Sequence, residues 1–381
     1  MRLRRPLLLL FCLVLVLLSG CSGVSKLASQ VAVSAPPEDY ISLDDGFRYT
    51  KSTLSPQVQS IYDQILMGIK THEEKITGLY PDTDMIQTAV QAIERDYPEL
   101  FWFAGTGQIE TTLLGETPLE ATYLPSYLMD KQEQDRLQQQ VDHWTAACLA
   151  SIPQNTPDYE KILAVYEYII ENTDYQPVER NSMINVMVNG AGMCGCYAKT
   201  TQYLLNLLGI DCAYISGTAN GESHAWNLVW VDGTPCWLDT TWGDPVFEGR
   251  TANDGPSYDY FCITTSDLLS THTIDSTVPV PYCGVNGYNY YRYYDLYFET
   301  FDREKLVSTL KRAIATNERQ VHLRFDRSVY PTVTHALFSE GEIYSLFQRA
   351  EADLQIRLSL NQSIWYSRND AMGTISITIP Y

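Results

Sequence analysis

The first half of the chain alternates apolar and polar residues with the period of an α-helix. In the interval 55–97, apolar side chains recur every three or four residues along one predicted face. They include Val58, Ile61, Ile65 and Ile69. Two further helices are expected over 131–151 and 156–175, and the segment 100–128 before them has the glycine turns and β-forming residues of short strands.

The end of the chain repeats this mixture of periods. Helical spacing covers 302–317 and 339–352, and the residues 319–325 alternate like a strand. Three more strands are expected over 354–360, 363–368 and 373–379. The two ends of the chain are therefore both expected to be α+β.

A helix that begins with a cysteine is predicted in the middle of the chain. One face of it carries Cys194, Ala198, Thr201, Leu205 and Leu208. Gly209 follows, where a helix commonly ends. In the first turn, unpaired backbone N–H groups and the helix dipole favour a thiolate at Cys194. Gly190 and Gly192 are expected to leave room for a substrate chain or an oxyanion. Cys196 lies about 200° further round the helix and is expected to point elsewhere.

Downstream, two strands are predicted on either side of an Asp-Gly turn at 232–233. If these two residues form the loop, Val231 faces Thr234. The same register makes His224 and Asp239 diagonal neighbours on one face, about 7 to 8 Å apart. The carboxylate then holds the imidazole while the other ring nitrogen meets a group from outside the hairpin. With the helix-start cysteine, these residues form a candidate nucleophile, base and orienting acid.

The same residues also allow a metal or redox interpretation, which their spacing disfavours. Zinc would need Cys194, Cys196 and His224, but Cys-x-Cys is shorter than the usual structural spacing and its side chains point apart on a helix. A disulfide between the two cysteines fails for a similar reason, because its Cβ atoms must lie about 4 Å apart. We therefore expect no metal and no cofactor.

Three separated motifs follow one another over 189–245, namely "GMCGCYA", "HAWN" and "DTTWGDP". This part of the chain resembles the core of the transglutaminase-like superfamily, and the resemblance covers about residues 155–275. It implies a papain-like arrangement, in which the helix carrying Cys194 packs on an antiparallel sheet, with His224 as the base and Asp239 as the orienting acid. It also implies cysteine-dependent acyl transfer or amide hydrolysis on protein or peptide substrates through a thioester.

Two departures from the family pattern bear on the substrate more than on the three residues. Cys196 stands where a glycine is usual, and "SMINVMVN" replaces the commoner small and aromatic residues ahead of the nucleophile. A non-catalytic module that binds a peptide or the cell envelope is the alternative function, since several families keep this fold after losing catalysis. The presence of all three residue types favours an enzyme.

The N-terminus has a basic head, an apolar run over 7–18 and then small residues, which is the layout of a secretory signal peptide. Its end, "LSGC", resembles a bacterial lipobox. The resemblance implies a lipid on Cys21 and an extracytoplasmic lipoprotein anchored to the bacterial cell membrane. The expected organisation is a signal peptide over 1–20, a flexible tether over 21–40, an N-terminal α+β region over 41–150, a transglutaminase-like core over 151–285 and a C-terminal α+β region over 286–381.

Charge and cysteine content narrow the partners. The chain has 46 acidic residues against 26 basic ones, for a formal net charge of −20. This excess argues against nucleic acid as a partner, because phosphate binding needs clustered Lys and Arg. Apart from Cys12 and Cys21, the cysteines are odd in number, so at least one thiol is expected to stay unpaired.

Overall fold

The computed structural model describes residues 46–244, 255–360 and 363–381, and these residues combine helices with several β-sheets. The α+β class expected from the sequence is thereby confirmed. The predicted signal peptide, Cys21 and the tether over 21–40 lie outside the described residues. In the part of the chain that is described, no helix combines the length and the apolar character of a membrane span.

The N-terminal region packs α2 and α3 against an antiparallel sheet with the strand order β1-β3-β2. Ser55 caps α2 by accepting a hydrogen bond from the N–H of Val58, and Asp82 caps α3 in the same way. The elements are α1 (Tyr49–Ser52), α2 (Pro56–Lys70), β1 (Ile76–Leu79), α3 (Thr83–Asp96), β2 (Phe103–Leu114) and β3 (Thr117–Tyr127).

The structure differs from two expectations for this region. The interval 55–97 is not helical throughout, because β1 interrupts it and pairs with β3. Four residues are too few for a strand to show a period of its own. The segment 100–128 forms two long strands in place of several short ones, and Gly115 supplies the positive φ of 63° at the turn between them.

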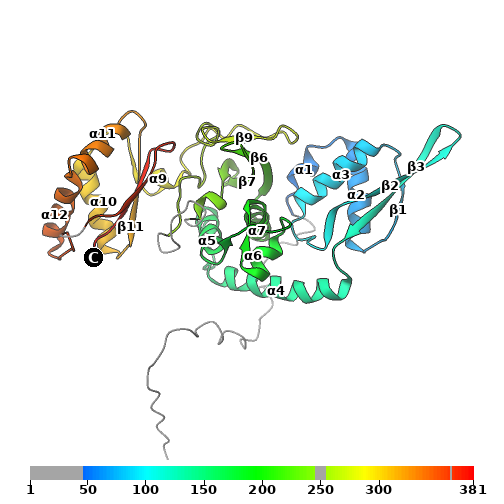
Figure 1. The fold of residues 1–381 in the computed structure, drawn as a ribbon, viewed down its shortest axis with the longest axis horizontal. Helices are drawn as coiled ribbons and strands as arrows, with labels where there is room; N and C mark the ends of the chain where they lie inside the picture. The colour runs from blue at the N-terminus through cyan, green and yellow to red at the C-terminus, as the bar shows by residue number, and fades with distance from the viewer. Residues whose placement is uncertain (1–45, 245–254, 361–362) are drawn as a thin grey trace, which may run out of the picture. The chain divides into compact units, whose positions relative to one another are not determined.

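The middle region surrounds α7 (Cys194–Leu207), in which every residue from Gly195 to Asn206 is buried. Helices α5 and α6 and strands β6 and β7 all pack against α7 (Figure 1). The helix is therefore buried all round, and not only along the stripe that its spacing predicts. The other elements are α4 (Lys131–Ala150), α5 (Asp158–Glu171), β4 (Asp174–Tyr175), α6 (Met183–Asn189), β5 (Ala191–Gly192), β6 (Cys212–Ala219), β7 (Glu222–Val231), β8 (Thr234–Leu238), a 3-10 turn (Thr241–Gly243), α8 (Thr265–Leu268) and β9 (His272–Ile274).

The hairpin of β7 and β8 has the register that its Asp-Gly turn predicts. Val231 pairs with Thr234, and both turn residues have positive φ, as a two-residue type I′ turn requires. Pairing stops at Leu238, so Asp239 leaves the ladder and donates its N–H to the carbonyl of Tyr260 at 3.1 Å. The antiparallel sheet has the order β8-β7-β6-β9, which brings β9 beside β6 from a distant part of the sequence.

The C-terminal region is a sheet with the order β10-β11-β13-β12, and it is packed with helices. Its elements are α9 (Tyr290–Tyr293), β10 (Tyr297–Phe298), α10 (Arg303–Ala315), β11 (Gln320–Phe325), α11 (Tyr330–Thr334), a π-helical turn (His335–Ser339), α12 (Glu342–Leu354), β12 (Tyr366–Asn369) and β13 (Thr374–Thr378). The two helices and the strands expected over 319–325 and 373–379 are confirmed. The strand expected over 354–360 does not form, because α12 extends to Leu354 and Gln355 turns the chain with a φ of 55°.

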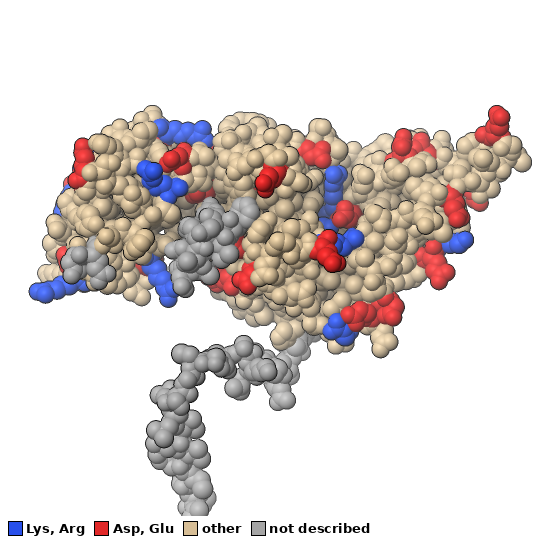
Figure 2. Space-filling model, viewed as in Figure 1, with Lys and Arg blue, Asp and Glu red and all other residues tan. Residues whose placement is uncertain are grey.

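Two polar contacts join the C-terminal region to the middle region. Arg324 donates to Asp267 at 2.6 Å, and the Asn369 side chain donates to Asp259 at 2.9 Å. On the face of the molecule drawn in Figure 2, acidic and basic side chains stand in small groups separated by uncharged surface. The described part of this face carries no continuous basic strip.

Candidate active site

Cys194 lies at the exposed end of a buried helix. Gly190 ends α6 with a φ of 67°, and β5 then pairs in parallel with β4. Met193 is extended and caps α7, so Cys194 is the first helical residue. Its side chain is half-buried, whereas the rest of the helix is enclosed. The local fold thus places a thiol in the first turn, where backbone N–H groups lack partners within the helix.

Cys196 faces a different environment, as its helical position predicts. Its Sγ lies 3.6 Å from Asn181 Oδ1 and 3.6 Å from Asn185 Nδ2, and the residue is fully buried. Gly192 packs directly on it, since a Cβ on Gly192 would lie 2.6 Å from the Cβ of Cys196. Gly192 therefore makes room for Cys196, and the space expected there for a substrate is filled by this packing.

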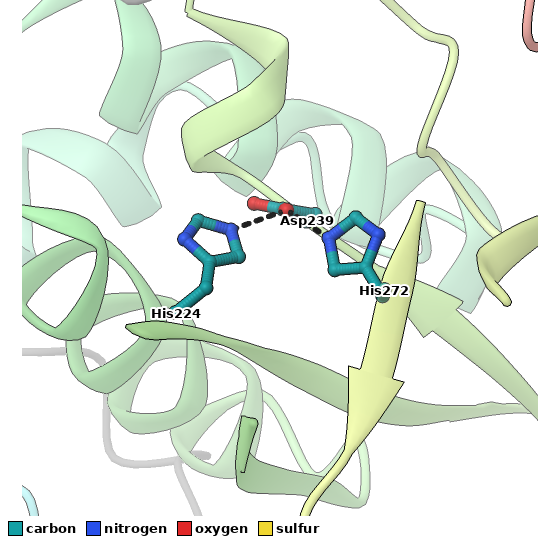
Figure 3. A group of neighbouring side chains, drawn as sticks. All are labelled: His224, Asp239 and His272. Atoms are coloured by element: carbon teal, nitrogen blue, oxygen red, sulfur yellow. Dashed lines mark hydrogen bonds and ion pairs between the residues drawn. The ribbon is translucent and has the colours of Figure 1, made fainter. Parts of the chain in front are cut away.

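His224 and Asp239 are brought together by the hairpin of β7 and β8. His224 Nε2 lies 2.7 Å from Asp239 Oδ2, and both side chains are buried, with exposed fractions of 6% and 1% (Figure 3). The Cys194 side chain is hydrogen-bonded to the same imidazole. The three residues singled out from the sequence thus lie side by side, with His224 between the thiol and the carboxylate.

The surroundings of His224 keep it protonated over a wide pH range. Burial alone lowers its pKa, but the charge of Asp239 and the hydrogen bonds from Asp239 and Cys194 outweigh burial and raise the pKa to about 10. For Asp239, burial raises the pKa, and the opposing effects of His224 and His272 leave it well below its usual range. At neutral pH the pair is therefore an imidazolium and a carboxylate.

A second imidazole, His272, also contacts Asp239, and sequence reasoning missed it. Its Nε2 lies 3.2 Å from Asp239 Oδ2, the oxygen that His224 also contacts (Figure 3). His272 belongs to β9 and reaches the site because β9 pairs with β6 at Ala219. Neither spacing nor a turn signal links β9 to the hairpin, so only the sheet order could have revealed this neighbour.

The ring nitrogens of His224 and His272 and a carboxylate oxygen of Asp239 lie within 4.8 Å of one another, which raises the question of a metal. Both nitrogens approach one oxygen at 2.7 and 3.2 Å, the separations of hydrogen bonds. An ion bonded to all three atoms at about 2.0 to 2.2 Å would have to replace both contacts. The donor set therefore fits a hydrogen-bonded carboxylate better than a metal site.

A cavity of about 670 Å³ borders His224. Residues of the middle region, among them Tyr175, Glu222 and Trp242, form one wall, and the turn after β12, with Arg368 and Asp370, forms another. The volume is in the range of ordinary ligand sites. The cavity is thus built by two parts of the chain that lie far apart in sequence.

Comparison with known proteins identifies the region that carries the site. Residues 147–241 match the model of the transglutaminase-like superfamily, so this segment, with Cys194, His224 and Asp239, is a transglutaminase-like domain. No curated protein gives a significant match to the sequence.

Three solved structures are similar to parts of the chain. A candidate cysteine protease from Cytophaga hutchinsonii is 18% identical over 38% of this chain and 65% of its own, with a TM-score of 0.25. A TGase is 15% identical over 44% of this chain and 50% of its own (TM-score 0.26). A candidate protease from Parabacteroides distasonis is 10% identical over 36% of each chain (TM-score 0.22). The matched part spans less than two thirds of each of these proteins, and likeness at this level fixes neither fold nor activity.

Proposed function

We propose that the transglutaminase-like domain catalyses cysteine-dependent acyl transfer or hydrolysis on peptide or glutamine amides. The observation that carries this proposal is the position of the His224 ring, which is hydrogen-bonded to Cys194 on one side and to Asp239 on the other. A positively charged imidazole beside a cysteine is the arrangement in which cysteine nucleophiles act as thiolates. Asp239 holds the ring in place and stabilises its charge.

Each residue has a defined part in the reaction. The Cys194 sulfur attacks the amide carbonyl carbon, and a C–S bond forms as the carbonyl oxygen becomes an oxyanion near the backbone N–H groups that start α7. His224 gives its proton to the amide nitrogen, the C–N bond breaks, and an amine leaves behind a thioester. Water or a second amine then gives a proton to His224 and attacks the thioester, which releases the thiol and the acyl product.

The cavity beside His224 suits the amine side of this reaction. His224 exchanges protons with the leaving amine and with the attacking amine or water, so these groups must lie next to its ring. The cavity wall carries the carboxylates of Glu222, Asp259 and Asp370 against the single guanidinium of Arg368. We infer a polar substrate whose amine-bearing portion enters this cavity.

We also propose that the protein acts outside the cytoplasm, held at the bacterial membrane by a lipid on Cys21. The support is the signal-like segment over 1–20 that ends in "LSGC". Processing should be sensitive to globomycin, and Cys21→Ala should release the chain from the membrane fraction. Retention of the Cys21→Ala protein in that fraction, with no added mass at Cys21 in the parent, would contradict the anchor.

The catalytic proposal is tested by brief exposure to iodoacetamide near neutral pH, followed by intact-mass and peptide analysis. Of the seven cysteines in the described residues, none forms a disulfide, and only Cys194 is not buried. Preferential labelling of Cys194 is expected, with a loss of at least about tenfold in rate in His224→Ala. The matched control is His143→Ala, which changes an exposed histidine of α4.

Even labelling of all the thiols, or labelling of Cys194 that is indifferent to His224, would sink the proposal. Turnover is then sought with a panel of glutamine peptides and amine acceptors, with Cys194→Ala as the inactive reference. A protein that binds peptides equally well with and without the Cys194 thiol, and that turns none of them over, would be the non-catalytic binding module.

A further inference from the structure

Asp239 has more partners than a nucleophile, base and acid require. Its Oδ1 accepts the N–H of Trp242 at 3.1 Å, while Oδ2 receives both His224 at 2.7 Å and His272 at 3.2 Å. His272 is 2% exposed, so its ring is as enclosed as the carboxylate. An imidazole buried in this way needs partners for both ring nitrogens.

The second nitrogen of His272 has such a partner. Its Nδ1 lies 2.8 Å from Thr271 Oγ1, and Thr271 Oγ1 lies 3.0 Å from the hydroxyl of Tyr260. One assignment satisfies every group: Tyr260 donates to Thr271, Thr271 donates to Nδ1, and the Nε2–H of His272 donates to Asp239. The chain of donors therefore points toward the carboxylate.

We propose that His272 is a positioning residue, whose Nε2–H fixes Asp239 Oδ2 and shares that oxygen with His224, so that Asp239 does not hold the His224 proton too strongly. This inference rests on the proposed function for its catalytic meaning, although the contact itself does not. Since both donors use one oxygen, each weakens that oxygen as an acceptor for the other. The base needs such moderation because it must release its proton to the leaving amine.

The surroundings of the two rings contain few other titratable groups. Asp239, Cys194 and Tyr260 contact or face the pair, and Tyr175 and Glu222 lie in the cavity wall near His224. The remaining neighbours are the rings of Trp226 and Trp242, with centroids 4.9 and 4.7 Å from that of His272. An aromatic replacement of His272 is therefore expected to keep the packing and remove only the donor.

The test measures the pKa of His224 by NMR titration of ring-labelled histidine. It is run in a Cys194→Ala background, because Cys194 raises the pKa of His224 and its removal brings the midpoint into a convenient range. His272→Phe removes the donor, whereas the amide of His272→Gln keeps one. We expect His272→Phe to move the midpoint up by about one pH unit and His272→Gln to leave it near that of the parent.

The direction of the change separates positioning from space filling. A His272 that only fills space would give a midpoint that is unchanged or lowered in His272→Phe, because a loosened site weakens the contact of His224 with Asp239. That result would overturn the proposal. Thr271→Val, which removes the hydroxyl behind His272, is a milder second variant that should move the midpoint in the same direction by less. His322→Phe, whose imidazole contacts Ser376 at 2.8 Å, is the control and should have no effect.

Activity provides the second readout and keeps the two proposals distinguishable. In the chain with Cys194 intact, His272→Phe should lower kcat on the order of tenfold with little change in KM, and His272→Gln should restore most of it. A parent protein without preferential alkylation of Cys194 contradicts the proposed function and leaves the NMR result standing. Equal kcat values for the Phe and Gln variants, in a reactive parent, contradict only the role of His272.

Discussion

The helix side and the strand side of the site are built in opposite ways. On the helix side, Cys194 starts α7 half-exposed, and its described polar contact is the one with His224. On the strand side, His224, Asp239 and His272 are 6%, 1% and 2% exposed and are joined by hydrogen bonds. The nucleophile is left accessible, and the groups that serve it are enclosed.

This difference follows from what each side must do. A thiol that attacks a peptide amide has to meet a bulky substrate, so it belongs at a helix end that faces outward. A carboxylate that holds an imidazolium acts most strongly where water is excluded, but a buried charge must be fully paired. Asp239 meets that demand with donors from β7, β9 and its own following turn.

The largest expected effect comes from breaking the strand side at its charge. Asp239→Asn removes the carboxylate that raises the pKa of His224, so burial then lowers that pKa. The deprotonation of His224 should move from about pH 10 to a lower pH, and the thiol should lose its cationic neighbour. We expect turnover and Cys194 alkylation at neutral pH to fall by about two to four orders of magnitude.

The measurement is the pH profile of Cys194 alkylation in the parent and in Asp239→Asn. The control is Asp244→Asn, which changes another buried carboxylate of the same segment, one that accepts the Tyr197 hydroxyl at 2.6 Å. This control should lose stability and keep the reactivity of Cys194. Equal losses of reactivity in the two variants would mean that the strand side matters only for folding.

Sequence patterns could predict the parts of the site that are local in the chain. The glycine-led helix start gave the position of Cys194, and the Asp-Gly turn fixed the register that brings His224 toward Asp239. The predicted pairing of His224 with Thr241 does not form, because the ladder ends at Leu238 and the chain turns into a 3-10 helix. The side-chain contact survives because it needs only the shared face of the hairpin.

The parts that join distant segments could not be predicted in this way. His272 reaches Asp239 only through the pairing of β9 with β6, and Arg368 and Asp370 reach the cavity only through the packing of the C-terminal region. The strand expected over 354–360 failed for a related reason, since apolar residues near a helix end can extend that helix as readily as begin a strand. Tertiary pairing decided each of these cases.

The smallest expected effect tests the packing beneath the helix side. A methyl group on Gly192 would lie 2.6 Å from the Cβ of Cys196 and 3.1 Å from its Sγ. Gly192→Ala should therefore cost about 1 to 3 kcal/mol in the free energy of unfolding through overpacking. Since the nearest atom is Cβ, Cys196→Ala should not relieve the cost, whereas Cys196→Gly should remove most of it.

A double-mutant cycle measured by urea denaturation isolates this coupling from the helix propensity of residue 196. Strong coupling of Gly192→Ala with Cys196→Gly, and weak coupling with Cys196→Ala, would show that the glycine and the cysteine are matched to each other. Alkylation of Cys194 in the Gly192→Ala, Cys196→Gly pair should then remain close to that of the parent, because the thiol depends on the strand side for its activation. A large loss of Cys194 reactivity in that pair, at unchanged stability, would mean instead that the helix side also sets the chemistry.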